Sequence, residues 1–223
     1  MHYRRSKKIF LYFFLFLIIG TFNNKNLNNF DFPRIKEINI TGLDDKEIYE
    51  LKEKLNFLMA NNLFSLNKIK VEEIINSNNL VEYYSVIKKY PSSLRIVIKK
   101  TKFLAYVKQN EKTFLLGSNG KLIDIQEMSQ NLPMIFGNFE NNNFFRIKKM
   151  IDKIDFDYKD IKNLFFFKSG RVDIETISGV VIKLPINQFE ESFKLVIKIL
   201  NDDQFKNIKE IDLRQKNQVV LSE

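Results

Sequence analysis

The sequence predicts an α+β protein in which a single N-terminal transmembrane helix precedes two folded regions. Three observations support this prediction. A basic segment is followed by an uncharged apolar run, Ile9–Phe22. Residues 35–100 then show the order strand, helix, helix, strand, strand. From residue 101 to 223, short strands bounded by turn residues dominate, which predicts a mostly antiparallel β domain with flanking helices.

The composition favours a folded protein and restricts the chemistry open to it. Hydrophobic residues make up 44% of the 223 residues, which is enough for a core. There is no Cys, and the only His is His2, so the sequence excludes disulfides and thiolate metal sites. The net charge of +9 has two explanations. The first is a basic surface that binds nucleic acid or anionic lipid. The second is an AT-rich genome, which enriches Lys, Asn, Ile and Phe. Acidic residues are mixed in along the chain and no nucleic-acid motif is found, which favours the second.

The N-terminal run is read as an uncleaved membrane anchor. Its fourteen residues would form a helix of about 21 Å, whereas the hydrocarbon core of a bilayer is about 30 Å thick. Lys7 and Lys8 can snorkel, and Tyr3 and the Asn residues after the run can extend the span at the interfaces. The alternative is a secretory signal, which is similar in length. No good small-x-small cleavage site follows the run, which favours retention.

The charge pattern predicts the orientation of the chain. Residues 1–8 contain four basic residues and no acidic one, and only Lys25 closely follows the apolar run. The positive-inside rule then makes 1–8 a cytoplasmic tail, 9–22 a transmembrane helix and 23–34 a polar linker outside the cytoplasm. No second apolar run is long enough to span a membrane, so the chain is predicted to cross once.

The first folded region, 35–100, begins with a strand that ends near Gly42. Asp44 or Asp45 is expected to cap a helix running to about Met59. A turn over 61–67 and a second helix, 69–76, follow. Two strands close the region, at about 83–90 and 93–99. In the last one, alternation predicts that Leu94, Ile96 and Ile98 share one face.

The second region, 101–223, is predicted to begin with strands joined by turns at Gln109-Asn110 and Asn119-Gly120. A connector at 132–138 and a helix from Phe144 to about Ile154 come next. The remaining elements are three strands, a helix and two last strands, expected at 161–168, 170–176, 179–185, 189–200, 208–214 and 218–222.

No pattern in the sequence predicts catalysis. A nucleophile would lack a usable His, there is no Gly-rich phosphate loop, and no His/Cys cluster could hold a metal. Adjacent carboxylates occur only where helix caps and flanks are expected, at 44–45, 72–73, 190–191 and 202–203. The sequence therefore predicts a non-enzymatic protein with no cofactor, no metal and no small-molecule substrate. It favours a binding module that adds a partner strand to an exposed sheet edge.

Several motifs, in order, resemble one family. The strand IKEINITG is followed by Asn62-Leu63-Phe64-Ser65-Leu66 in the turn and by Tyr90-Pro91 before the alternating strand. Further on, LPMIFG matches an LP-x-x-x-G segment, and IKEIDLR precedes the last strand. Together they resemble the FtsQ/DivIB family of bacterial cell-division proteins, over essentially the whole chain. The resemblance implies a POTRA domain at 35–100 and an FtsQ-type C-terminal β domain at 101–223.

The chain departs from the family pattern at a few positions. It reads KKTKF at 99–103, where the family usually has an acid and a proline. Gly117 stands where Asp is usual, Val172 where an aromatic residue is frequent, and Gln215 where some members carry Tyr.

The resemblance also implies a function. The protein would be a single-pass inner-membrane divisome scaffold at the septum, linking early and late division proteins outside the cytoplasm. Its POTRA domain would dock other division proteins, and its C-terminal domain would bind FtsB, paired with FtsL, by edge-strand addition. The implied contact residues are Arg171, Arg214, Gln215, Val219, Val220 and Leu221.

Other interpretations remain open at this point. Val219 and Leu221 could instead face inward as core residues of the last strand. A POTRA-bearing component of outer-membrane assembly or secretion is the alternative function, although no β-barrel of many strands follows the POTRA region. A secreted enzyme with a cleaved signal would be recognised by a mature N-terminus near residue 23.

Overall fold

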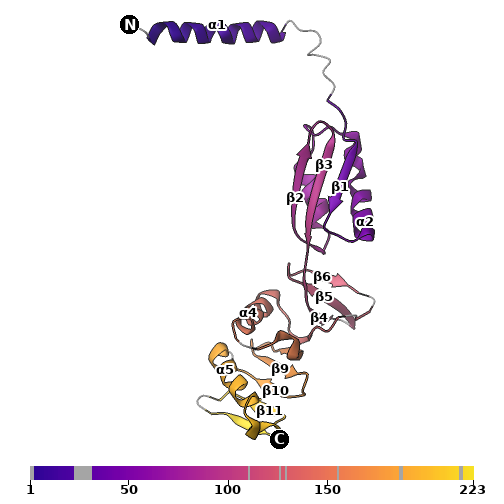
Figure 1. Ribbon diagram of the computed structural model, residues 1–223. Helices are drawn as coiled ribbons and strands as arrows, with labels where there is room; N and C mark the ends of the chain where they lie inside the picture. The colour runs from indigo at the N-terminus through magenta and orange to yellow at the C-terminus, as the bar shows by residue number, and fades with distance from the viewer. Residues whose placement is uncertain are drawn as a thin grey trace. The chain divides into compact units, whose positions relative to one another are not determined.

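The computed structural model describes residues 3–22, 32–109, 111–125, 127–128, 130–154, 156–185, 188–215 and 218–223 (Figure 1). The predicted linker 23–34 therefore lies mostly outside the described residues, and so does Asn110 of the first predicted turn. The chain forms two compact units. The first comprises Met1–Ile74 and Ser85–Val97, and the second comprises Ile75–Tyr84 and Ile98–Glu223.

The N-terminal apolar run is helical. Helix α1, Tyr3–Phe22, contains all fourteen residues of the run, and its apolar side chains from Ile9 to Ile19 are all exposed. Within the described part of the chain, no helix has both the length and the apolarity required to cross a membrane.

The predicted order strand, helix, helix, strand, strand is confirmed. The elements are β1 (Glu37–Thr41), α2 (Asp45–Leu55), the 3-10 helix η1 (Asn56–Ala60), α3 (Lys68–Asn76), β2 (Val81–Lys89) and β3 (Ser93–Lys100). Their three-stranded sheet has the order β1-β3-β2, and β1 is parallel to β3.

Local sequence accounts for these elements. The backbone N–H of Asp44 donates to the Glu47 carboxylate at 3.0 Å, so a carboxylate satisfies a backbone donor at the start of α2, as in a capping box. In β3, Leu94, Ile96 and Ile98 are buried while Arg95, Val97 and Lys99 are exposed, so the predicted alternation is confirmed.

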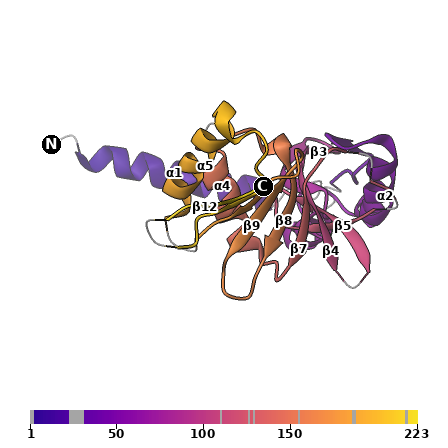
Figure 2. The ribbon, with the colours of Figure 1, turned by 90° about the horizontal axis from the view of Figure 1, so that it is seen from below.

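The second unit is built on a nine-stranded sheet of order β12-β11-β10-β9-β8-β7-β4-β5-β6. Figure 2 shows β9, β8, β7, β4 and β5 side by side. Five of the strand pairs are antiparallel, as predicted for most of this sheet, and three are parallel. The strands are β4 (Phe103–Gln109), β5 (Lys112–Gly117), β6 (Leu122–Asp124), β7 (Met134–Gly137), β8 (Ile161–Phe166), β9 (Val172–Thr176), β10 (Val181–Lys183), β11 (Glu210–Asp212) and β12 (Val220–Ser222).

The predicted connector at 132–138 is wrong, because Met134–Gly137 forms strand β7. This strand lies between β4 and β8 and is parallel to both. Met134, Ile135 and Phe136 are all apolar and stand between Pro133 and Gly137, so the segment shows no alternation and is bounded by residues typical of turns.

Two helices cover one face of the large sheet. They are α4 (Asn141–Ile151) and α5 (Phe189–Leu200), and the 3-10 helices η2 (Tyr158–Asp160) and η3 (Asp203–Phe205) complete the unit. Phe144 and Phe193 are the largest fully buried side chains of the unit, and they belong to the same core cluster as Leu164 and Ile174 of the sheet. The helices therefore fix which face of the sheet is core and which is open.

Candidate partner-binding surface

Strand β12 stands at one end of the strand order and pairs with β11. Val219, Val220 and Leu221 are 39%, 48% and 36% exposed. Val219 and Leu221 are therefore not buried core residues, although Leu221, in register with the buried Ile211, lies on the core face of the sheet. Side chains on both faces of β12 therefore reach solvent.

Leu221 continues a row of apolar residues that crosses the sheet. In register on successive strands, the row consists of Val107, Ile135, Leu164, Ile174, Ile182, Ile211 and Leu221. The first six are at most 1% exposed, and only Leu221 is open to solvent. Neighbouring residues in register share a face, so the row marks the core face of the sheet and ends unburied at β12.

The opposite face carries charges near the same edge. Asp173, Lys183, Asp212 and Val220 lie in register on β9 to β12. Lys183 forms an ion pair of 2.6 Å with Glu210, so acidic and basic groups alternate across the open face up to Val220.

Two arginines hold the carboxylates of this face. The guanidinium of Arg171 lies 3.1 Å from Asp173 and stacks 3.7 Å from the ring of Phe167. Arg214 Nε donates to both oxygens of Asp212, at 2.8 and 2.9 Å, and its Nη2 also donates to Oδ2. The charge-assisted hydrogen bonds orient the Arg214 guanidinium, whereas Arg171 meets Asp173 as an ion pair and Phe167 as a ring contact.

The two carboxyls have pKa values shifted in opposite directions. Burial raises the pKa of Asp173, although Arg171, Arg214 and Lys183 oppose the rise. Hydrogen bonds from the Arg214 side chain lower the pKa of Asp212. Asp173 is influenced by both arginines, which therefore belong to one electrostatic cluster on the open face.

The predicted contact residues do not all lie together. Arg171 and Arg214 join the charged cluster, to which Val220 is adjacent through Asp212, while Leu221 points to the core face. Gln215 is exposed in the turn after Arg214, where its carbonyl accepts a hydrogen bond from the backbone N–H of Gln218 at 3.4 Å.

Sequence reasoning missed the carboxylates of this surface, Asp173 and Asp212. Each lies two positions from its arginine, and residues at that spacing share a face of a strand. That signal is present in GRVDIET and IKEIDLR.

Two family models match the chain. One is the POTRA domain, FtsQ-type, over residues 34–100, and the other is the C-terminal region of cell division protein FtsQ/DivIB, over residues 105–214. The cell division protein DivIB of Clostridium botulinum (strain Loch Maree / Type A3) is 28% identical over 92% of this chain and 86% of its own length. The cell division protein FtsQ of Rickettsia bellii (strain RML369-C) is 22% identical over 84% of this chain and 72% of its own.

The chain belongs to the FtsQ/DivIB family. The resemblance found in its motifs is thereby confirmed, and this family is not a known enzyme family. The matched C-terminal region of this FtsQ/DivIB chain ends at Arg214, so Gln215 and β12 lie beyond it.

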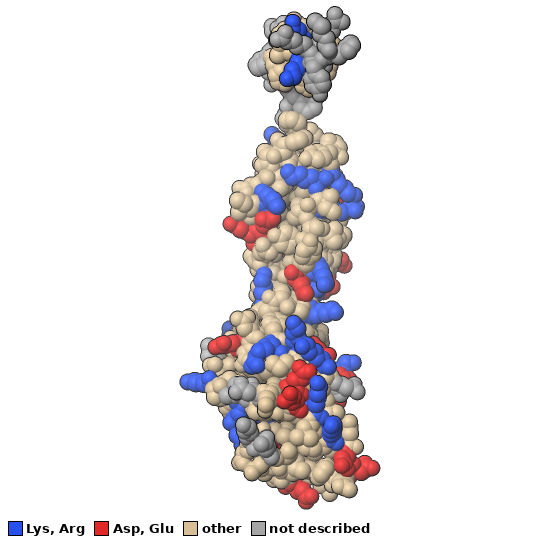
Figure 3. Space-filling model, turned by 90° about the vertical axis from the view of Figure 1, so that its left-hand side faces the viewer, with Lys and Arg blue, Asp and Glu red and all other residues tan. Residues whose placement is uncertain are grey.

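Outside this surface, metal binding or catalysis would require a particular grouping of side chains. Among the described residues, no three His, Cys, Asp or Glu side chains are grouped so that they could hold a metal. Three of the adjacent carboxylate pairs, 44–45, 190–191 and 202–203, lie at helix starts, where Asp202 caps η3 by accepting from the N–H of Gln204 at 3.0 Å, and the fourth, 72–73, lies in the middle of α3. On the face drawn in Figure 3, acidic and basic side chains are intermixed.

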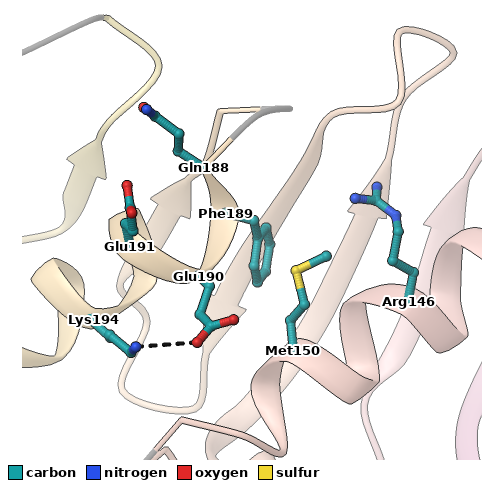
Figure 4. A pocket seen from close by; sticks show the side chains of 7 residues that line it. All are labelled: Arg146, Met150, Gln188, Phe189, Glu190, Glu191 and Lys194. Atoms are coloured by element: carbon teal, nitrogen blue, oxygen red, sulfur yellow. Dashed lines mark hydrogen bonds and ion pairs between the residues drawn. The ribbon is translucent and has the colours of Figure 1, made fainter.

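One open pocket of about 600 Å³ lies between α4 and the start of α5 (Figure 4). An ion pair of 3.2 Å between Lys194 and Glu190 crosses one side of it. Its other lining residues are Arg146, Met150, Gln188, Phe189 and Glu191. These side chains form no nucleophile–base pair of the kind that covalent catalysis uses.

Proposed function

We propose that this protein is a bacterial cell-division scaffold whose C-terminal strand β12 accepts a strand from FtsB, itself paired with FtsL. The observation that carries the proposal is the apolar row that ends at Leu221, which is 36% exposed while the other six members are buried. A strand added beside β12 would continue the row and remove Leu221 from water. The main chain of β12 would supply hydrogen bonds, and the side chains would fix the register.

The charged cluster supports a role in binding for the open face of β12, on which Val220 lies. Val220 lies beside Asp212, whose carboxylate is held by Arg214. Because the Arg214 side chain is 38% exposed, it can meet an acidic group of the added strand. Arg171 lies further from the edge, on the turn before β9. We propose that it acts indirectly, because Arg171 and Arg214 both interact electrostatically with the Asp173 carboxylate.

The same proposal includes attachment to the inner membrane at the division septum. Helix α1 exposes an unbroken run of apolar side chains from Ile9 to Ile19, and basic residues precede the run. We propose that α1 anchors the chain with its N-terminus in the cytoplasm. Residues 35–100 would then form a POTRA domain that docks further division proteins, and residues 101–223 would form the FtsB-binding domain, both outside the cytoplasm.

The experiment compares two substitutions at similarly exposed leucines. Leu221→Asp places a charge at the end of the apolar row, and Leu195→Asp places one on α5, where the side chain is 40% exposed. We expect L221D to weaken binding of purified full-length protein to the FtsB–FtsL complex at least about tenfold, the loss typical of a central contact. L195D should bind like the wild type.

A depletion strain supplies the test in cells. Loss of the protein should give filaments, which L195D prevents and L221D does not. Thermal unfolding of both variants excludes misfolding as the cause. If L221D binds the complex as tightly as the wild type, the site is wrong; if depleted cells divide normally, the division role is wrong.

A further inference from the structure

Three exposed aromatic rings form a cluster in the first unit. The ring of Phe64 lies 4.3 Å from that of Phe32 and 5.1 Å from that of Tyr90, measured between centroids. Phe64 and Tyr90 are 57% and 60% exposed, and Phe32 is 39% exposed. The rings therefore contact one another while presenting much of their area to solvent.

The cluster is constructed by the fold, because backbone bonds join the three segments that carry the rings. Ile35 N–H donates to the Asn61 carbonyl and Lys36 N–H to the Ser92 carbonyl, both at 2.8 Å. In the turn, the Asn62 side chain accepts from the N–H groups of Phe64 and Ser65 at 2.9 Å. Leu63 is fully buried, so its neighbour Phe64 is held outward.

Basic residues outnumber acidic ones in the segments that carry the rings. The segments 31–37, 56–67 and 86–93 contain four basic residues and two acidic ones, Asp31 and Glu37. The basic residues are Arg34, Lys36, Lys88 and Lys89, and all are exposed. Lys88 also donates to the Leu63 carbonyl at 2.6 Å, which ties one of these charges to the turn.

The chain itself limits how far the cluster can lie from α1. Only residues 23–31 separate Phe22 from Phe32, so the two positions are at most about 36 Å apart even when the segment is fully extended. A tether of this length gives a weak surface contact a high effective concentration.

We infer that the cluster of Phe32, Phe64 and Tyr90, with its surrounding basic residues, docks the first unit onto an anionic lipid surface. Aromatic rings, Tyr above all, favour the boundary between headgroups and acyl chains, and the basic side chains attract anionic headgroups. The inference rests on the proposed membrane attachment through α1, and it adds that the first unit lies against the bilayer.

The chain contains no Trp, so the indole fluorescence of a variant with one introduced Trp comes from that residue alone. Full-length Phe64→Trp protein is reconstituted into vesicles of equal parts phosphatidylcholine and phosphatidylglycerol with brominated acyl chains. We expect its emission to shift to shorter wavelength and to be quenched relative to vesicles without bromine. Tyr90→Trp should behave alike, which keeps the test valid if one variant folds poorly.

The matched control is Tyr49→Trp, on α2 of the same unit at 66% exposure, which should be neither shifted nor quenched. Adding Lys88→Gln and Lys89→Gln to F64W should reduce the quenching. Co-sedimentation with the vesicles is recorded in every case. Protein that fails to sediment contradicts the membrane attachment, and the docking inference falls with it.

Protein that sediments while F64W and Y90W emit like Y49W overturns the docking inference alone. The docking inference is also overturned if the F64W emission shifts only after the FtsB–FtsL complex is added. The cluster would then bind a protein and not the lipid surface.

Discussion

Gly137 shows how a single residue type can be required by a close backbone approach. It ends β7 with a φ of +86°, and a Cβ placed on it would lie 2.2 Å from the carbonyl oxygen of Phe166. Both the dihedral angle and the contact demand glycine. The motif LPMIFG, which pointed to the family, thus contains a residue whose structural reason the sequence alone did not supply.

Replacing Gly137 by Ala should destabilise the second unit by roughly 2–5 kcal/mol, the sum of a strained backbone and an overpacked contact. Gly170→Ala is the matched control, because Gly170 has a φ of +83° but a Cβ added there would meet no atom within 4 Å. It should lose only the backbone part, about 1–3 kcal/mol. Urea unfolding of both variants measures the difference, and equal losses would contradict the steric explanation.

The charged residues of the candidate surface could be predicted only in part. Arg171 and Arg214 were found through family motifs, because Arg next to a strand has no periodic signature of its own. Their carboxylate neighbours Asp173 and Asp212 follow from i±2 spacing once the strands are known. Both arginines interact with the Asp173 carboxyl because β9 pairs with β10 and β10 pairs with β11. Local sequence does not specify these strand pairings.

At the scale of elements, periodicity predicted most helices and strands because each buries one face. Helix α5 was predicted at its observed bounds, 189–200, because apolar residues recur at helical spacing along it, and Phe193 and Val196 of that stripe are buried. Strand β7 was missed because its residues 134–136 are all apolar and lie between Pro133 and Gly137, which favoured a connector. The last strand was found, and Leu221 does lie on the core face, but its exposure was not predicted, because VVL has no polar residue to mark a solvent-facing position.

Because β12 is a three-residue edge strand, a single proline should disable it. Val220→Pro removes a backbone donor and is poorly tolerated within a ladder. We expect binding of FtsB–FtsL to fall at least about tenfold, with a loss of stability below about 2 kcal/mol because the strand is exposed. Val220→Thr keeps a β-branched side chain and the N–H, and should bind normally. Unchanged binding by a folded V220P protein would refute strand addition.

At the scale of the whole molecule, the sheet order is what the sequence revealed least. The apolar row from Val107 to Leu221 joins residues more than a hundred positions apart, through the parallel pairs β4–β7, β7–β8 and β10–β11. Parallel neighbours need long crossovers, and no local signal specifies which strands they join. Only the assembled sheet makes Leu221 recognisable as the exposed end of a buried row.

The function proposed for the whole chain requires that α1 stays attached to the folded units. We therefore expect protein isolated from the membrane fraction to retain residues 1–22, because Gly20-Thr21-Phe22 offers no small-x-small cleavage site. Intact-mass measurement of the isolated protein decides this. Phe22→Ala supplies the control, since it creates a Gly-x-Ala site; that variant should be cut near residue 22 and released from the membrane. A wild-type chain that begins near residue 23 would show that α1 is a cleaved signal. Both the proposed membrane anchor and the proposed lipid contact of the first unit would then be wrong.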